Sequence, residues 1–460
     1  MISRLQARLD LQILLGGSDE LIKVSQVSPY EVTWTRNLPA VADELEVSFD
    51  SSLLPVDLRG VRGVQVLFWL FEHQDPRRCA PGDPGFFSGY SDEIGRRRTE
   101  RTVTLSCRDW TAAVLDAKVT PKELKSVDVQ KLGSLEAVVK RLLSLGPASS
   151  DWEVRSLSAA GARNVFTTLS KNTAIKRVAA KGKGKTPKQA TQRRQFTLEA
   201  LADGDETAVW DVVCQLCARM GVVPEVTAGE KVPVVLLVDA LDLQTSDVLR
   251  PFARNGSGAG RTLTLGRTVA TFDETLRLTR DADLPDQVVV GAWDHEKGTM
   301  VEVAFPYDAK AKKGDKLRRV YQVAEGTADQ AVLTRVAAAA WAATRQHQLE
   351  VEVETWSPWS DGGGPHDPDL LDIGAGAALA IQVSGAYAHN LAREEREAFE
   401  RLDDKVQEAF TSANASVPRS LLFQVGEVTH TFSAGDSPDY ACRLKINAFL
   451  GEQPEPPKAA

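Results

Sequence analysis

The chain has 460 residues, of which 43% are hydrophobic and 26% charged, the composition of an ordinary folded soluble protein with two to four domains. A net charge of −8 argues against general nucleic-acid binding, and five cysteines do not form a disulfide framework. Apolar runs such as Val64–Leu70 are strand-sized, and the first residues contain no secretory signal, so we expect folding in a cytoplasm and no membrane insertion.

The first hundred residues predict antiparallel strands. Apolar and polar residues alternate along Leu9–Ile13, Leu45–Phe49 and Val103–Cys107. A period of two places one face of each strand in a core and the other in water, which is typical of antiparallel sheets. Several such strands favour a barrel or sandwich, interrupted by a loop at 74–95 that is rich in Pro, Gly and Arg.

Helices are predicted in the middle of the chain. Ser134 is a suitable N-cap for a helix over 135–142, and Gly221 follows a second helix over 206–220. Thr327 begins a capping-box pattern at the start of a third helix.

The second half adds strands at 301–305, 349–353 and 420–450, and a fourth helix after Asn390. This order predicts an α+β fold that is mainly β, with two antiparallel β-barrel domains and interspersed helices. We expect the following domains, which need not be continuous: a first barrel at 1–130; a mixed helix and strand domain at 131–265, with a basic insertion at 171–195; a second barrel at 266–390; and a helix, C-terminal strands and a disordered tail at 391–460.

Motifs for small-molecule chemistry are incomplete. Gly184–Thr186 resembles the end of a P-loop but lacks the glycine needed five residues earlier, and Gly374–Gly376 lacks the third glycine of a dinucleotide fingerprint. Cys214–Cys217 fits two buried helix cysteines better than a zinc site, and His366–Asp369 fits a polar loop better than a metal site. No carboxylate pair is set up for acid–base catalysis. We therefore expect no enzyme activity, no catalytic residue, no cofactor and no metal.

The segment from Lys171 to Arg194 contains nine Lys or Arg and no acid. Such a stretch repels itself and stays extended. It is either a solvated insertion loop or an electrostatic contact with an acidic partner or nucleic acid. The candidate contact residues are Lys181, Lys183, Lys185, Arg193 and Arg194.

Phe87–Asp92, followed by Val103–Trp110, resembles the strands and short helix of the late-control-type (late control D-like) tail proteins, the central baseplate hub proteins of contractile phage tails. Further segments resemble that family in the same order: Leu45–Phe49, Trp210–Met220, Leu265–Val269, Leu284–Val290, Ala328–Arg345, Leu370–Gly374 and Leu379–Ile381. The resemblance covers about residues 40–385. The loop at 73–95 and the basic insertion depart from the pattern.

The resemblance implies a structural hub that links a hexameric tail tube to a trimeric spike and forms part of the central channel. Each subunit of such a hub supplies two tube-type barrels, so a homotrimer presents six near-equivalent sites on one face. The implied partners are the tail tube protein, a separate spike protein, tape measure and baseplate wedge proteins, and DNA only in transit. The particle would be a virion tail baseplate or an equivalent contractile injection machine, assembled in the bacterial cytoplasm.

Glu350, Glu352 and Glu354 alternate with Leu349, Val351 and Val353, so the glutamates share a wet strand face. We expect either an ordinary outer surface or, in a trimer, a channel lining that repels DNA phosphates. Two other functions stay open beside the hub. One is a tail-tip peptidoglycan hydrolase, which needs a carboxylate pair in a cleft. The other is a wedge or tail-tip adaptor.

Overall fold

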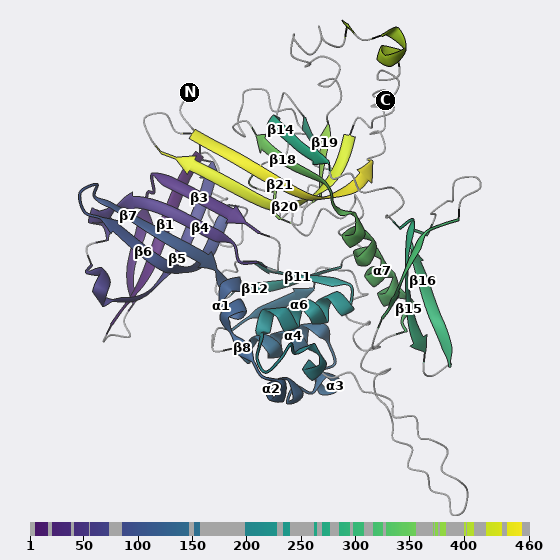
Figure 1. Cartoon of the computed structure of the whole chain (residues 1–460). Coiled ribbons are helices and arrows are strands. Elements are labelled where there is room, and N and C mark those ends of the chain that lie inside the picture. The colour runs from purple at the N-terminus through teal and green to yellow at the C-terminus, as the bar shows by residue number, and fades with distance from the viewer. Residues whose placement is uncertain are drawn as a thin grey trace, which may run out of the picture.

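The structure is a computed structural model of the whole chain. It describes residues 5–16, 21–37, 41–54, 56–72, 85–146, 151–156, 198–227, 233–239, 262–264, 269–276, 285–294, 298–307, 316–324, 328–355, 371, 373–375, 378–382, 400–401, 403–408, 420–434 and 439–452. Figure 1 shows strands at both sides and a smaller helical unit below them. None of the described helices combines the length and apolar character that a membrane crossing requires.

The N-terminal strands form one antiparallel region around a common core. The alternation predicted for these strands is confirmed: Leu9, Val47 and Leu105 are fully buried, while the neighbouring Glu46 and Ser106 are exposed. Two short 3-10 turns, η1 (Ser51–Leu53) and η2 (Leu58–Gly60), connect strands at one end. The strands are β1 (Leu5–Leu15), β2 (Leu21–Val27), β3 (Glu31–Arg36), β4 (Glu44–Asp50), β5 (Val61–Glu72), β6 (Phe86–Arg97) and β7 (Thr102–Asp109).

A long C-terminal hairpin extends this region into a 13-stranded sheet. Strand β20 (Ser420–Ser433) pairs with β3, and its partner β21 (Asp439–Glu452) pairs with β18 (Gln346–Thr355). The sheet order is β14-β18-β21-β20-β3-β4-β7-β6-β5-β1-β2, with β13 (Thr262–Thr264) and β19 (Ala378–Gln382) attached through β20. Strand β14 (Val269–Leu276) forms one edge of this path and β2 forms the opposite edge. One hydrophobic core therefore contains residues from both ends of the chain.

The middle of the chain forms an α/β unit with its own core. Ser134 caps α4 as predicted, since its side chain accepts a hydrogen bond from the Ala137 amide at 3.2 Å. Gly221 follows α6 in a left-handed conformation (φ 66°). The elements are α1 (Trp110–Asp116), β8 (Lys118–Val119), α2 (Pro121–Lys125), α3 (Val129–Leu132), α4 (Leu135–Leu143), β9 (Glu153–Ser156), η4 (Leu198–Leu201), β10 (Thr207–Ala208), α6 (Val209–Arg219), β11 (Val222–Thr227) and β12 (Val234–Asp239).

A third unit consists of one helix on a three-stranded sheet. Strands β15 (Gln287–Asp294), β16 (Thr299–Phe305) and β17 (Arg319–Val323) have the order β16-β15-β17, and α7 (Gln330–Arg345) covers one face. Leu333 and Ala337 of α7 are fully buried against this sheet. Its cap is Asp329, whose carboxylate accepts the amide hydrogens of Ala331 and Val332, while Thr327 lies outside the described residues.

The fold class is confirmed as mainly β with large antiparallel sheets. Within the described residues the large sheet runs as an open path from β14 to β2, so closure into barrels stays a prediction. The strands expected together at 266–390 belong to two sheets, because β14 and β18 pair with the C-terminal hairpin whereas β15, β16 and β17 pair with one another. The domain boundaries stay predictions.

Candidate functional site

The acidic strand face expected from the sequence lies on β18. Val351 and Val353 are buried, Glu352 is exposed, and Glu354 is half-buried, so the expected alternation is present. Glu350 belongs to the same strand, but its side chain lies outside the described residues.

Cations from the neighbouring strand share this face, which the sequence did not indicate. Antiparallel pairing places Lys445 opposite Glu352 and Arg443 opposite Glu354, and the Arg443 Nε lies 3.7 Å from a Glu354 oxygen. Lys445 donates to Glu427 of β20 at 2.8 Å. This hydrogen bond, with a smaller effect of the nearby carboxylates, raises the pKa of Lys445. Exposed pairs of this kind contribute roughly 0–1 kcal/mol.

The face as a whole still carries an excess of negative charge. One row across four strands contains Asp273, Glu352, Lys445 and Glu427, which is three carboxylates against one ammonium. The adjacent row pairs one carboxylate with one guanidinium. A mildly acidic mixed surface, rather than a purely acidic wall, is what the described residues provide.

The other charged candidates are not placed by the structure. The basic contact residues Lys181, Lys183, Lys185, Arg193 and Arg194 lie outside the described residues, as do Gly184–Thr186 and His366–Asp369.

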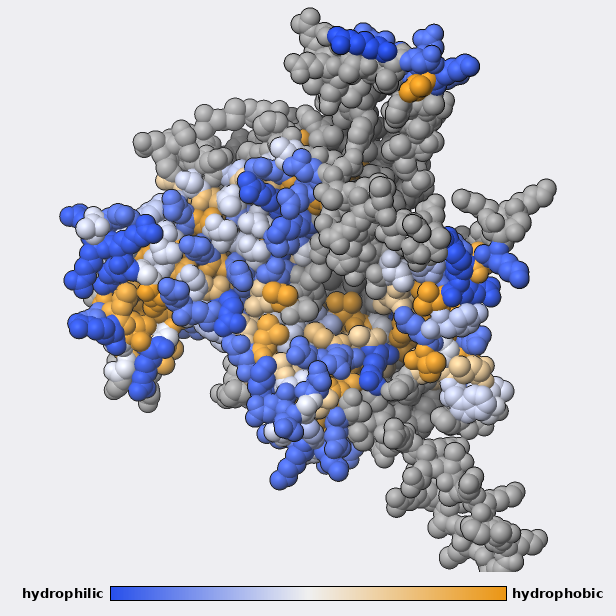
Figure 2. All heavy atoms as spheres, viewed as in Figure 1, coloured by the Kyte–Doolittle hydropathy of each residue, from blue (hydrophilic) through white to orange (hydrophobic). Residues whose placement is uncertain are grey.

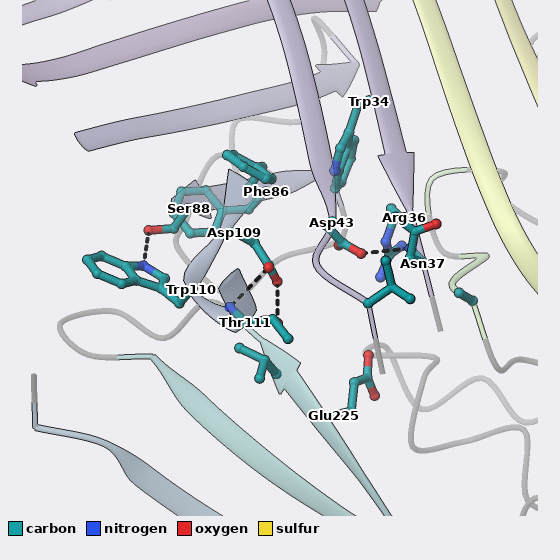
Figure 3. A pocket seen from close by; sticks show the side chains of 14 residues that line it. Trp34, Arg36, Asn37, Asp43, Phe86, Ser88, Asp109, Trp110, Thr111 and Glu225 are labelled. Carbon is teal, nitrogen blue, oxygen red and sulfur yellow. Dashed lines mark hydrogen bonds between the residues drawn. The ribbon is translucent and has the colours of Figure 1, made fainter. Parts of the chain in front are cut away.

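A small pocket lies where the first β region (β1–β7) meets β11 of the α/β unit (Figure 3). Its volume is about 40 Å³. Polar side chains from three parts of the chain line it together with aromatic rings: Trp34, Arg36, Asn37, Asp43, Phe86, Asp109 and Glu225.

Asp109 is the most deeply buried carboxyl group of this pocket. It caps α1, since its carboxylate accepts the Thr111 amide at 3.0 Å and the Thr111 hydroxyl at 2.9 Å. Burial first, and then the charge of Asp43, raise the pKa of Asp109 well above its usual value, although the two Thr111 hydrogen bonds act in the opposite direction. The group therefore has a structural role and an unusually high affinity for a proton.

Arg36 joins the first β region to the segment before β19. Its Nη1 donates to the Ile373 carbonyl at 3.1 Å, and its guanidinium lies 5.4 Å from the centre of the Trp34 indole. Gly374, part of the incomplete dinucleotide fingerprint, lies beside this guanidinium, and a strand follows rather than the helix that such a fingerprint requires. Gly374 therefore packs against Arg36.

The pocket is too small for a sugar or nucleotide. Small-molecule sites usually measure roughly 300–1,000 Å³, whereas about 40 Å³ accommodates a few water molecules. No group of three or more His, Cys, Asp or Glu suited to a metal ion occurs in the part of the chain that the structure describes. The pocket therefore offers no support for the hydrolase alternative.

A buried histidine was missed by the sequence analysis. His430 on β20 is fully buried and its Nδ1 lies 2.8 Å from the Tyr440 hydroxyl of β21. Burial, and then the charge of Arg36, lower the pKa of His430 to about 3, so the ring is neutral. Its position between the buried Val428 and Phe432 was the available signal, because alternate residues of a strand share a face.

The two cysteines of the CxxC pattern lie on α6, as predicted, although Cys214 is half-buried rather than buried. Cys217 is fully buried in the core of the α/β unit, and burial raises its pKa well above the usual value. Burial also raises the pKa of Cys214 to about 12. Both are therefore protonated, unreactive thiols at neutral pH.

Comparison with known proteins gives structural neighbours only. No protein-family profile and no curated protein matches the sequence. Similar solved structures include a tail protein from Neisseria meningitidis MC58 (12% identity, TM-score 0.45, covering 95% of this chain and 96% of that one). Another is the 43 kDa tail protein of prophage MuSo2 from Shewanella oneidensis (10% identity, TM-score 0.45, covering 96% and 98%).

A further neighbour is a component of the Escherichia coli type VI secretion system, at 11% identity and a TM-score of 0.39, covering 95% of this chain and 76% of that one. These neighbours are phage tail and type VI secretion proteins. The TM-scores of these three structures lie below 0.5, and the position of this chain within such a machine is a matter for proposal.

Proposed function

We propose that this chain is a structural hub of a contractile tail or injection machine, which joins a hexameric tail tube to a trimeric spike as a ring of three copies. The observation that carries the proposal is the C-terminal hairpin. Strands β20 and β21 hold the N-terminal strands and the strands β14 and β18 in one sheet. A subunit that matches six-fold to three-fold symmetry must present two β regions in a fixed relation, and a continuous hydrogen-bonded sheet supplies that rigidity.

The partners follow from this position: the tail tube protein on one face, a separate spike protein on the other, and tape measure and wedge proteins nearby. The basic residues between Lys171 and Arg194 are proposed to contact an acidic partner. The mixed face around Glu352 and Glu354 is proposed to line the channel.

The decisive experiment is reconstitution of this chain with its tube and spike proteins, followed by mass measurement and electron-microscopic reconstruction. Three copies in one ring between tube and spike support the hub. Six copies in a ring, or a single copy, would overturn it. Clearing of peptidoglycan by the purified chain would favour the hydrolase instead.

A further inference from the structure

The sheet β16-β15-β17 has apolar residues on both faces, and among the described elements α7 covers one of them. The middle strand contains an unbroken apolar run from Val288 to Trp293, which is typical of a strand buried on both sides. Val288, Val290 and Ala292 face α7 and belong to the core of this unit. The next residues in the alternation, Val289, Gly291 and Trp293, point to the opposite face. Val289 and Gly291 are buried there, whereas Trp293 is exposed.

Large apolar side chains of the two flanking strands lie on that same opposite face, called here the outer face. Pairing places Met300 of β16 opposite Trp293, and Tyr321 and Val323 of β17 opposite Val289 and Gly291. A Cβ atom on Gly291 would lie 3.0 Å from the Met300 methyl group, so Met300 covers that glycine. The outer face is therefore largely apolar, with Glu302 of β16 beside Gly291.

This surface is exposed in the single chain. Trp293 is 52% exposed, Met300 46%, Tyr321 64% and Val323 75%. Figure 2 shows hydrophobic residues at the surface of this unit, at the right of the molecule. A largely apolar patch of this kind in a soluble protein marks an interaction surface.

The size of the outer face fits a stable contact with a folded protein. The four exposed side chains leave on the order of 450 Å² of apolar surface, given roughly 150–250 Å² for a complete aromatic side chain. A standard interface buries about 800 Å² on each partner, of which a little over half is apolar, or about 450 Å². One partner covering the outer face would thus complete an interface of ordinary size.

The charges and the position of the outer face select the partner. Among the residues that the structure describes, it contains one acid, Glu302, and one base, Arg319. A surface with both signs does not repel an identical chain and does not attract DNA or a membrane of one sign. The unit lies on the opposite side of the molecule from β1–β7 (Figure 1), and subunits that meet head to tail around a ring use two different surfaces, one on each side.

We infer that a second copy of this chain covers the outer face formed by Trp293, Met300, Tyr321 and Val323, as a subunit contact of the ring. The inference rests on the proposed function, since it names the partner of this surface within the three-copy hub. A subunit contact that persists is expected to be more apolar than a transient one, in agreement with two aromatic rings and a methionine at its centre.

Methionine oxidation tests the inference at one position in the unaltered protein. The chain has three methionines, of which Met220 is 1% exposed and Met300 46% exposed. Dilute hydrogen peroxide followed by peptide mass spectrometry gives the oxidation rate of each, in the monomer and in the assembled ring. We expect Met300 to be oxidised at least 10-fold more slowly in the ring, and Met220 to be slow in both states. Equal Met300 rates in monomer and ring would overturn the inference.

Substitution provides a second readout. Tyr321→Asp or Val323→Asp should raise the concentration at which half of the chain is assembled by at least 10-fold, with an unchanged circular dichroism spectrum. The matched control is Val406→Asp, since Val406 is 41% exposed and lies at 403–408, outside both the outer face and β1–β7; it should assemble normally. If Tyr321→Asp forms a normal ring but loses the tube or spike protein, the outer face belongs to that partner and the inference is wrong. If the wild-type chain forms no ring with its partners, the proposed function fails as well.

Discussion

His430 and Tyr440 form a polar pair inside the hydrophobic core, with the histidine Nδ1 2.8 Å from the tyrosine hydroxyl. The two residues lie on β20 and β21, the strands that join β1–β7 to β14 and β18 in one sheet. Both residues are buried. A buried polar atom that loses its only partner costs roughly 1–3 kcal/mol. The pair is therefore a sensitive point of the hairpin.

Tyr440→Phe should lower the free energy of unfolding by about 1–3 kcal/mol, because His430 Nδ1 then remains buried without this partner. Urea unfolding followed by tryptophan fluorescence measures the change. Tyr307→Phe is the control, since the Tyr307 hydroxyl donates to Thr334 at a surface that is 65% exposed for Tyr307; it should change stability by less than about 0.5 kcal/mol. Equal losses of unfolding free energy in the two variants would show that the buried hydrogen bond stabilises the fold no more than the exposed one.

Acid should destabilise the core through His430. Its pKa is about 3 in the folded protein against 6.5 for the ordinary group, so the unfolded chain binds the proton first. The resulting stability is complete above pH 6.5 and is lost as pH falls toward 3, by up to about 1.4 kcal/mol per pH unit. His430→Gln removes this titration, so its stability should fall less steeply between pH 6.5 and 4 than that of the wild type. Parallel curves would contradict the assignment.

Asp109 should make stability depend on pH in the opposite direction. Its folded pKa is raised above 3.8, so its contribution is most favourable below that pH and is lost as pH rises through the folded value. Asp109→Asn keeps an oxygen to cap α1 but does not titrate. Relative to this variant, the wild type should lose stability steadily as pH rises from 4. A stability difference that does not change with pH would mean that the carboxyl group titrates normally.

Gly221→Ala should destabilise the contact between the α/β unit and α7. Gly221 has φ 66°, and a Cβ atom there would lie 2.3 Å from the Arg335 Cβ. Gly133→Ala is the matched control, because Gly133 has φ 72° but no atom within 4 Å of the added carbon. The control should lose about 1–2 kcal/mol from its left-handed backbone alone, and Gly221→Ala about 1–3 kcal/mol more from the clash. Thermal and urea unfolding give both values; similar losses would show that α7 moves aside freely.

Reversing the charges of Glu350, Glu352 and Glu354 to Lys tests the channel lining. If this face lines the channel, assembly should proceed while DNA or cargo passes more slowly and is retained at low salt, because added lysines contact phosphates. The control changes Asp203, Asp205 and Glu206, three exposed acids of the α/β unit, to Lys. Unchanged passage in the first variant, or equal slowing in both, would place the glutamates on an outer surface.

Helix ends could be predicted from the sequence, whereas the pairing of strands far apart in the chain could not. Ser134 before an apolar periodic segment and Gly221 after one predicted two helix ends, because caps depend on neighbouring residues only. The cap of α7 was displaced to Asp329, since both Thr and Asp can cap and the pattern alone does not select one.

The charged face of β18 was likewise predicted only in part. Alternation predicted that Glu352 and Glu354 share a side of their strand, but not that Arg443 and Lys445 lie beside them. Those cations come from a strand about ninety positions further along, and its register is set by the packing of the whole sheet rather than by nearby residues. For the same reason, the sequence grouped β15 with β18 although they belong to different sheets.

The pairing of β20 with β3 has a consequence for biosynthesis. Strand β3 ends at Arg36 and β20 begins at Ser420, so a ribosome that adds roughly 5–20 residues per second completes the second strand about 20–80 s after the first. Throughout that interval one edge of β3 has no partner, and an open strand edge is a template for pairing with other chains. Nascent copies on one messenger are close together during the same interval. This topology therefore favours chaperone binding to the emerging N-terminal strands until translation reaches the last hairpin.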